Sequence, residues 1–200
     1  MPRVTALRPA RPGRVRVELD GSSWRTVPLD VAARAELSVG LELDRARLRR
    51  LRRELRASAA VDTAARSLSR RDRSELGVRR ILEGKGVAGR EADDAVGTLR
   101  RAGAVDDGRF ARGRASALAE RGFGDSAIRF ELEREGLSAE LISEAVCRLP
   151  PEDERAVALA LRRGSGIRTA RWLARRGFSL DSIERAMPGI AESDGTELGC

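Results

Sequence analysis

The chain has 200 residues, of which 41% are hydrophobic and 35% are charged, a balance typical of a globular protein. It contains no histidine, which excludes Ser-His-Asp and Cys-His catalysis and HExxH metal sites. The formal net charge is +8 and is carried almost wholly by arginine, because Lys85 is the single lysine.

The basic excess is concentrated towards the N-terminus. Residues 1–56 hold 14 arginines against 7 acidic residues, residues 57–134 have a net charge of +3, and residues 135–200 have a net charge of −2. A basic end is typical of proteins that bind nucleic acid or an acidic protein surface. A general preference for arginine would give the same pattern, so both interpretations stay open at this point.

The expected compartment is the cytoplasm. The sequence has no apolar run of about 18 residues that could span a membrane, and its N-terminus lacks the pattern of a signal peptide. The two cysteines, Cys147 and Cys200, lie far apart, so we expect no structural disulfide and interpret Cys147 as a small buried residue at a helix end.

The first thirty residues predict a small antiparallel sheet. Residues 4–7 and 13–29 alternate apolar and polar positions, with Val15, Val17 and Leu19 on one face, and Asp20-Gly21 is a hairpin dipeptide.

Two helices are expected next. Asp30 is positioned to cap a short helix that ends before Gly40, and Asp44 to cap a strongly basic helix. That second helix has a narrow apolar stripe of Leu48, Leu51 and Leu55.

From about residue 57 the chain shows three tandem copies of one helical pattern. Each copy is anchored on a glycine that ends its second helix, and each has a leucine four residues earlier and an apolar pair nine and ten residues later. Further matches lie 18 and 21 residues before each anchor. The aligned columns are Gly86, Gly136 and Gly177; Leu82, Leu132 and Leu173; Ala95, Ala145 and Ala186; Val96, Val146 and Met187; Leu68, Leu118 and Leu159; and Ala65, Ala115 and Ala156.

These repeats define the expected fold. It is mainly α, with three tandem three-helix repeats that stack, share a core and form an elongated curved rod, preceded by a small N-terminal segment that contains a β-hairpin. The expected parts are a basic N-terminal extension, three repeats and a flexible tail, at residues 1–56, 57–103, 104–149, 150–190 and 191–200.

Asp106 and Asp107 stand just before a predicted helix, and a second aspartate pair, Asp93-Asp94, falls early in a neighbouring helix. A side-chain oxygen at a helix start accepts a hydrogen bond from a free backbone N–H group, so the pair is interpreted as helix capping. The competing hypothesis, a metal or catalytic dyad, needs further ligands or a base at the same place.

Arginines on the polar faces are the candidate contact residues for a partner, which could be a nucleic acid or a nucleoprotein surface. Solvated arginines balanced by acidic neighbours are the alternative for each one. The candidates are Arg49, Arg52, Arg70, Arg71, Arg73, Arg79, Arg80, Lys85, Arg109, Arg112, Arg114, Arg121 and Arg129. Among the aromatic residues, most are expected in the core, Trp24 included, whereas Phe130 is expected on the surface.

The segment 105–146, VDDGRFARGRASALAERGFGDSAIRFELEREGLSAELISEAV, resembles the middle block of the RecX family. Residues 68–86 resemble the first-repeat block of that family, with Ser74, Glu75, Arg80, Leu82, Lys85 and Gly86 in the expected places. The third repeat fits the family pattern more loosely, and Gly77 and Gly97 depart from it.

The resemblance implies a non-enzymatic modulator of the RecA recombinase that needs no cofactor. Members of the family bind RecA and the groove of the RecA-DNA filament and restrain its ATPase and strand-exchange activities, in DNA repair, recombination and the SOS response. Two other functions stay open: an architectural module that binds DNA directly and independently of RecA, and a metal-dependent nuclease that uses the aspartate pairs.

Overall fold

The hairpin dipeptide Asp20-Gly21 folds as expected, since both residues adopt positive φ angles of 49° and 82°. It joins the second and third strands of an antiparallel sheet ordered β1-β2-β3, made of Val4–Pro9, Arg14–Leu19 and Ser22–Pro28. Val15 and Val17 point into a small core, as predicted. This computed structural model describes residues 1–87 and 89–188.

Two helices follow the sheet, α1 (Leu29–Arg34) and α2 (Arg45–Leu68). Asp44 caps α2 as predicted, accepting a 2.7 Å hydrogen bond from the Arg47 N–H. The prediction for Asp30 is wrong: it lies inside the first turn of α1 and forms an ion pair with Arg34, one turn further on.

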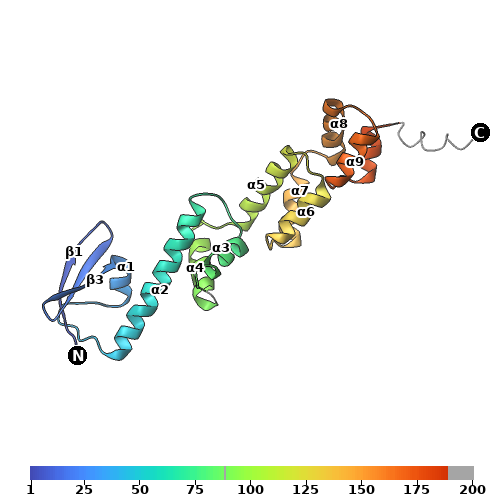
Figure 1. Cartoon of the computed structure of the whole chain (residues 1–200). Helices are drawn as coiled ribbons and strands as arrows, with labels where there is room; N and C mark the ends of the chain where they lie inside the picture. Colours follow the sequence, from blue (N-terminus) through green and yellow to red (C-terminus); the bar gives the residue numbers. More distant parts are fainter. Residues whose placement is uncertain (88, 189–200) are drawn as a thin grey trace, which may run out of the picture. The chain divides into compact units, whose positions relative to one another are not determined.

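Helix α2 is one continuous helix of 24 residues, so the expected boundary at 56/57 falls within it (Figure 1). The basic segment and the first helix of the first repeat share it because no glycine or proline interrupts residues 45–68.

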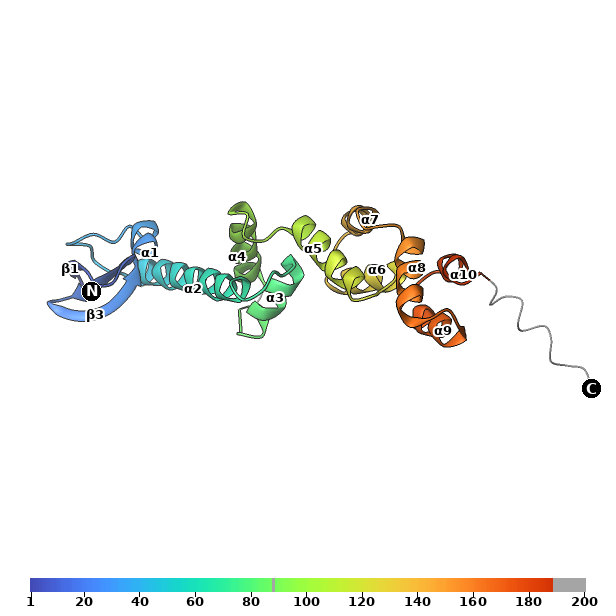
Figure 2. The ribbon, with the colours of Figure 1, turned by 90° about the horizontal axis from the view of Figure 1, so that it is seen from above.

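The three predicted repeats are present as three helices each. Figure 2 shows their helices, and the first repeat starts with the C-terminal part of α2. Their remaining helices are α3 (Glu75–Glu83), α4 (Arg90–Arg101), α5 (Asp107–Glu120), α6 (Asp125–Arg134), α7 (Ala139–Cys147), α8 (Glu152–Arg163), α9 (Ile167–Arg175) and α10 (Leu180–Ala186).

The repeat columns correspond to the cores. All three anchor glycines have φ between 77° and 81°, the left-handed conformation that ends a helix, and the leucines four residues before them are fully buried. One column is wrong in the first repeat, because Ala65 is exposed and Ala64 takes the buried position. The turn that follows α2 differs in length, so the spacing counted back from Gly86 is off by one residue.

Each repeat has a hydrophobic core of its own among the described residues. The expectation that neighbouring repeats share a core is therefore wrong. Short helices rich in alanine pack closely enough to close a small core within three helices, as Ala111 and Ala115 do in the second repeat.

The chain divides into two compact units, residues 1–71 with 78–105, and residues 72–77 with 106 onward. Within the second unit, two junctions are built in the same way. In the first, the Asp107 carboxylate accepts a 2.8 Å hydrogen bond from the Glu75 N–H at the start of α3, and Gly136 packs against Leu76.

The second junction joins the third repeat to the second. The Glu152 carboxylate accepts a 2.6 Å hydrogen bond from the Asp125 N–H at the start of α6, and Gly177 packs against Ala127. The same carboxylate also accepts hydrogen bonds from the hydroxyl groups of Ser179 and Ser182, at 2.6 and 3.0 Å. Burial alone would raise the pKa of Glu152, but these hydrogen bonds outweigh it and lower the pKa below its ordinary value of 4.5.

Three residue-level expectations differ from the structure or lie outside it. Cys147 is exposed, because it is the last residue of α7 and its neighbour Val146 takes the inward position. Trp24 is 40% exposed on the outer face of β3. The predicted tail, with Cys200, lies outside the described residues.

The buried leucine column is tested by Leu132→Ala. We expect a loss of about 2–5 kcal/mol in the free energy of unfolding, because the change leaves a cavity in the second-repeat core. Denaturant unfolding followed by circular dichroism measures it. Leu161→Ala, at a position 82% exposed, is the control and should stay within about 0.5 kcal/mol of the original protein. Equal stability of the two variants would show that the repeat columns are misassigned.

The glycine contact at the second junction is tested by Gly177→Ala against Gly86→Ala. Both glycines have positive φ, but a Cβ at 177 would lie 2.6 Å from the Ala127 nitrogen, whereas a Cβ at 86 would meet no atom within 4 Å. We expect Gly86→Ala to lower the free energy of unfolding by about 1–2 kcal/mol, because alanine is strained at a positive φ. Gly177→Ala should lower it by roughly 1–3 kcal/mol more, because its Cβ also clashes with Ala127. Thermal unfolding compares them, and equal losses would mean that the junction contact is not tight.

The charge of Glu152 is tested by Glu152→Gln. Because its pKa is lowered on folding, the carboxylate stabilises the fold above the unfolded pKa, and this contribution is lost as the pH falls through the folded pKa. The variant should therefore be less stable than the original protein at pH 7, with the difference shrinking towards pH 3. Denaturation midpoints at both pH values measure this. The matched control is Glu184→Gln on the exposed side of α10, and a Glu152 effect that is independent of pH would contradict the prediction.

Candidate partner-binding surface

Asp106 and Asp107 are both used as helix caps, so the capping prediction is confirmed. Asp106 accepts a 2.8 Å hydrogen bond from the Arg109 N–H of its own helix, while Asp107 caps α3. The backbone hydrogen bond from Arg109 holds the pKa of Asp106 below its ordinary value. No group of three or more potential metal-ligating side chains occurs among residues 1–87 and 89–188. The two carboxylates thus face two different helix starts rather than a common ligand.

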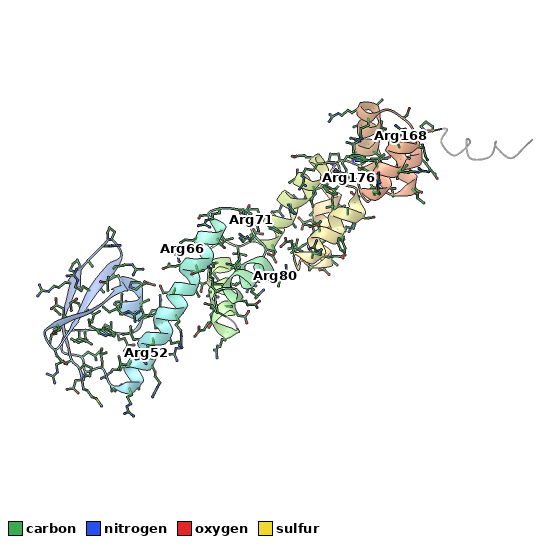
Figure 3. The ribbon with its side chains drawn as sticks, viewed as in Figure 1. Arg52, Arg66, Arg71, Arg80, Arg168 and Arg176 are labelled. Carbon is green, nitrogen blue, oxygen red and sulfur yellow. The ribbon has the colours of Figure 1, made fainter. Side chains whose placement is uncertain are left out.

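In the first unit, the turn between α2 and α3 carries two exposed candidates. Arg70 and Arg71 are exposed there, and within the described part of the chain neither makes an ion pair. Figure 3 shows Arg71 at this turn and Arg80 on α3. Arg80 and Lys85 are exposed as well.

Two candidates near this turn are less accessible than expected. Arg73 is half-buried beside the start of α3, so it does not lie on the solvated face. Arg79 is also half-buried, and its Nε donates a 2.9 Å hydrogen bond to Asp93 on α4. The Arg79 side chain therefore links α3 to α4 within the first repeat.

On α2, Arg49 and Arg52 are exposed as expected. The neighbouring Arg56 forms a 3.0 Å ion pair with Glu91, which links α2 to α4. Leu51 is buried and provides the centre of the apolar stripe that holds this helix.

In the second unit, most candidates face acidic or polar neighbours. Arg112 lies 3.7 Å from Glu144 and Arg114 lies 3.8 Å from Glu131, both half-buried. Arg129 donates a 3.3 Å hydrogen bond to the Ser143 hydroxyl. These three link the helices of the second repeat to one another, which leaves less of their charge for a partner.

The other two candidates of this unit, Arg109 and Arg121, are exposed. Phe130 is 59% exposed on α6, as predicted, with the Arg134 guanidinium 6.0 Å from its ring centre. The second unit therefore offers an aromatic side chain at its surface together with scattered positive charge.

Sequence reasoning missed a basic cluster in the third repeat. Residues 155–180 contain seven arginines and no acidic residue, but the acidic residues on either side give residues 135–200 a net negative charge. A shorter window for counting charge would have found it. Figure 3 shows two of these side chains, Arg168 and Arg176, on the third repeat.

Among the described residues, no helix is both long and apolar enough to cross a lipid bilayer.

Comparison with known proteins agrees with the repeat pattern. Residues 106–146 match the family model described as RecX, second three-helix domain. The regulatory protein RecX of Stenotrophomonas maltophilia strain R551-3 is 33% identical over 145 residues, which cover 68% of this chain and 89% of that protein. The regulatory protein RecX of Vibrio vulnificus strain CMCP6 is 29% identical over 136 residues, covering 63% of this chain and 89% of that protein.

The fold has a counterpart among solved structures. A crystal structure of regulatory protein RecX superposes with a TM-score of 0.80 over 92% of this chain and 98% of that one, at 22% sequence identity. With the fold, the repeat columns and the relatives in agreement, the chain belongs to the RecX family of regulatory proteins.

Proposed function

We propose that this chain binds the RecA recombinase and its filament on DNA, and restrains the ATPase and strand-exchange activities of the filament. Its membership of a regulatory family supports this proposal at the level of a regulatory role. The observation that carries the finer part is the pair Arg70 and Arg71, exposed and without ion pairs within the described residues.

The position of this pair suits a contact with a large, negatively charged assembly. A turn between two helices projects both guanidinium groups from a rigid base, since Leu68 and Val78 on either side belong to the first-repeat core. The backbone of this turn is anchored by the core and loses little further entropy on binding, whereas each arginine side chain still costs about 0.5–1.5 kcal/mol to immobilise. Arginine is enriched at energetically important interface positions. Arg80 and Lys85 on the same repeat, Arg109 and Arg121 on the second repeat, and Arg49 and Arg52 on α2 complete the exposed set.

The half-buried candidate arginines are poor positions for testing partner binding. Arg79, Arg112 and Arg114 already face carboxylates, so their replacement would disturb the repeats as well as any contact. Tests of binding therefore belong to the exposed residues, and Arg73 is left out of the test for the same reason.

The test is the single-stranded-DNA-dependent ATPase rate of RecA with substoichiometric amounts of this protein. We expect the original chain to lower the rate and to hydrolyse no ATP alone. The double variant Arg70→Ala/Arg71→Ala should require roughly tenfold more protein for the same effect, because each lost interface arginine costs on the order of 1 kcal/mol or less. Circular dichroism should be unchanged.

The matched control is Arg11→Ala/Arg25→Ala, which removes two exposed arginines from the N-terminal sheet. Equal loss of inhibition in both variants would show that inhibition depends on the net charge of the chain and not on the position of Arg70 and Arg71. If the original chain had no effect on the RecA ATPase rate, the proposal would be overturned. Tight binding to bare DNA in that second case would favour the architectural module instead.

A further inference from the structure

The third repeat carries a run of arginines that no acidic residue interrupts, at residues 155–180. Of the seven arginines in residues 155–180, Arg155 bonds to the Asp125 carboxylate and is half-buried. The other six form no ion pair within residues 1–87 and 89–188. They lie at the end of α8 and along α9 and its C-cap, at Arg162, Arg163, Arg168, Arg171, Arg175 and Arg176.

Part of this cluster is a row in which arginines alternate with aromatic rings. The guanidinium carbons of Arg163 and Arg176 lie 4.2 and 4.6 Å from the centre of the Trp172 ring. Arg176 also lies 4.7 Å from the Phe123 ring, and Arg121 lies 5.5 Å from that same ring. Arg176 therefore sits between the two rings and brings the second and third repeats together.

Cation–π contacts hold these guanidinium groups without neutralising them. Each contact is worth about 0.5–2 kcal/mol and leaves the N–H groups at the guanidinium edge available as donors. Charges of one sign held this close together repel one another, and a bound anion would relieve that repulsion. The Arg176 side chain is fixed further by a hydrogen bond from its Nη1 to the Arg121 carbonyl oxygen.

A second part of the cluster lines one face of α9. Arg168, Arg171 and Arg175 are spaced three and four residues apart, all are exposed, and the buried Leu173 lies on another face. Seven residues of helix rise about 10 Å, a length that spans roughly three phosphates of one nucleic-acid strand at 3.4 Å each.

The start of α9 adds backbone donors to the same place. At both junctions of the second unit, the equivalent helix start receives a carboxylate, from Asp107 or Glu152. At α9 the N-cap is Gly166, and no side chain among the described residues caps it. An anionic oxygen is thus the chemical group that this repeat position accepts elsewhere in the chain.

We propose that Arg121 and the six arginines of the third repeat that form no ion pair within the described residues make up a surface that binds the phosphate backbone of nucleic acid. The cluster has no acidic residue, and its two rings already carry guanidinium groups, so it offers charge and N–H donors rather than apolar area. Planar guanidinium groups match phosphate oxygens in pairs. An acidic protein surface is the competing partner and becomes an outcome of the test. The inference does not depend on the binding of RecA.

The test uses the full chain without RecA, a fluorescein-labelled 30-nucleotide dT strand and a labelled 30-base-pair duplex. Fluorescence anisotropy gives Kd at NaCl concentrations from about 50 to 200 mM. The variant Arg168→Gln/Arg171→Gln/Arg175→Gln should raise Kd roughly tenfold or more at the low end of this range. It should also make the slope of log Kd against log salt shallower by about 2–3, because three phosphate contacts are lost.

The matched control is Arg11→Gln/Arg16→Gln/Arg25→Gln, which removes the same charge from exposed positions on β2, on β3 and in the turn between β1 and β2. It should change Kd by less than about threefold. A triple lysine variant at 168, 171 and 175 keeps the charge and should keep the salt slope, which separates loss of contact from loss of folding.

Three outcomes would overturn the inference. The first is equal weakening by both glutamine variants, which would show a general charge effect. The second is failure of the original chain to bind either nucleic acid at the low-salt end. The third is unchanged nucleic-acid binding by the α9 variant together with weaker binding to the RecA filament, which would assign the cluster to an acidic protein surface.

Discussion

The second unit depends on one interaction, made twice: a carboxylate at the start of one repeat's first helix caps the second helix of the preceding repeat. Asp107 does this for α3 and Glu152 for α6. The first free N–H groups of a helix must find acceptors, and an anion there also meets the positive end of the helix dipole. Because a glycine packs at the same place, Gly136 on Leu76 and Gly177 on Ala127, the repeats approach closely where the cap forms. The junction is polar and tight, which is why each repeat can keep a separate core.

Arginine takes the place that larger apolar residues hold in many helical proteins. Only 3% of the residues are aromatic, and the short helices bury alanine, valine and leucine. The spaces between helices are then bridged by ion pairs such as Arg79 with Asp93, and by guanidinium groups on rings, as with Arg176 between Trp172 and Phe123. The number of arginines in a segment therefore does not distinguish the arginines that link helices from those that are available to bind a partner.

The two roles of arginine, linking helices and offering charge to a partner, explain which features the sequence could predict. Helical period, glycine anchors and turn dipeptides act locally, so the sheet, the repeats and the caps at Asp44 and Asp106 followed from spacing. The partner of each arginine is set by tertiary packing, so the pattern that predicts Arg112 and Arg114 as contact residues does not reveal that they face Glu144 and Glu131. The same limit applies to Cys147, whose exposure depends on where α7 ends.

Two kinds of basic surface result, and they differ in how freely they can bind. Where carboxylates are interleaved, as on the second repeat, a partner must compete with existing ion pairs, and its gain in free energy is small. Where the described residues form no ion pair, as along α9, the arginines repel one another, and binding of an anion relieves that repulsion. A regulator that carries both kinds can hold its repeats together with one set of arginines and keep the other for its partner. The strength of a contact then depends less on the number of arginines in a repeat than on the absence of acidic residues beside them, and in this chain residues 155–180 meet that condition.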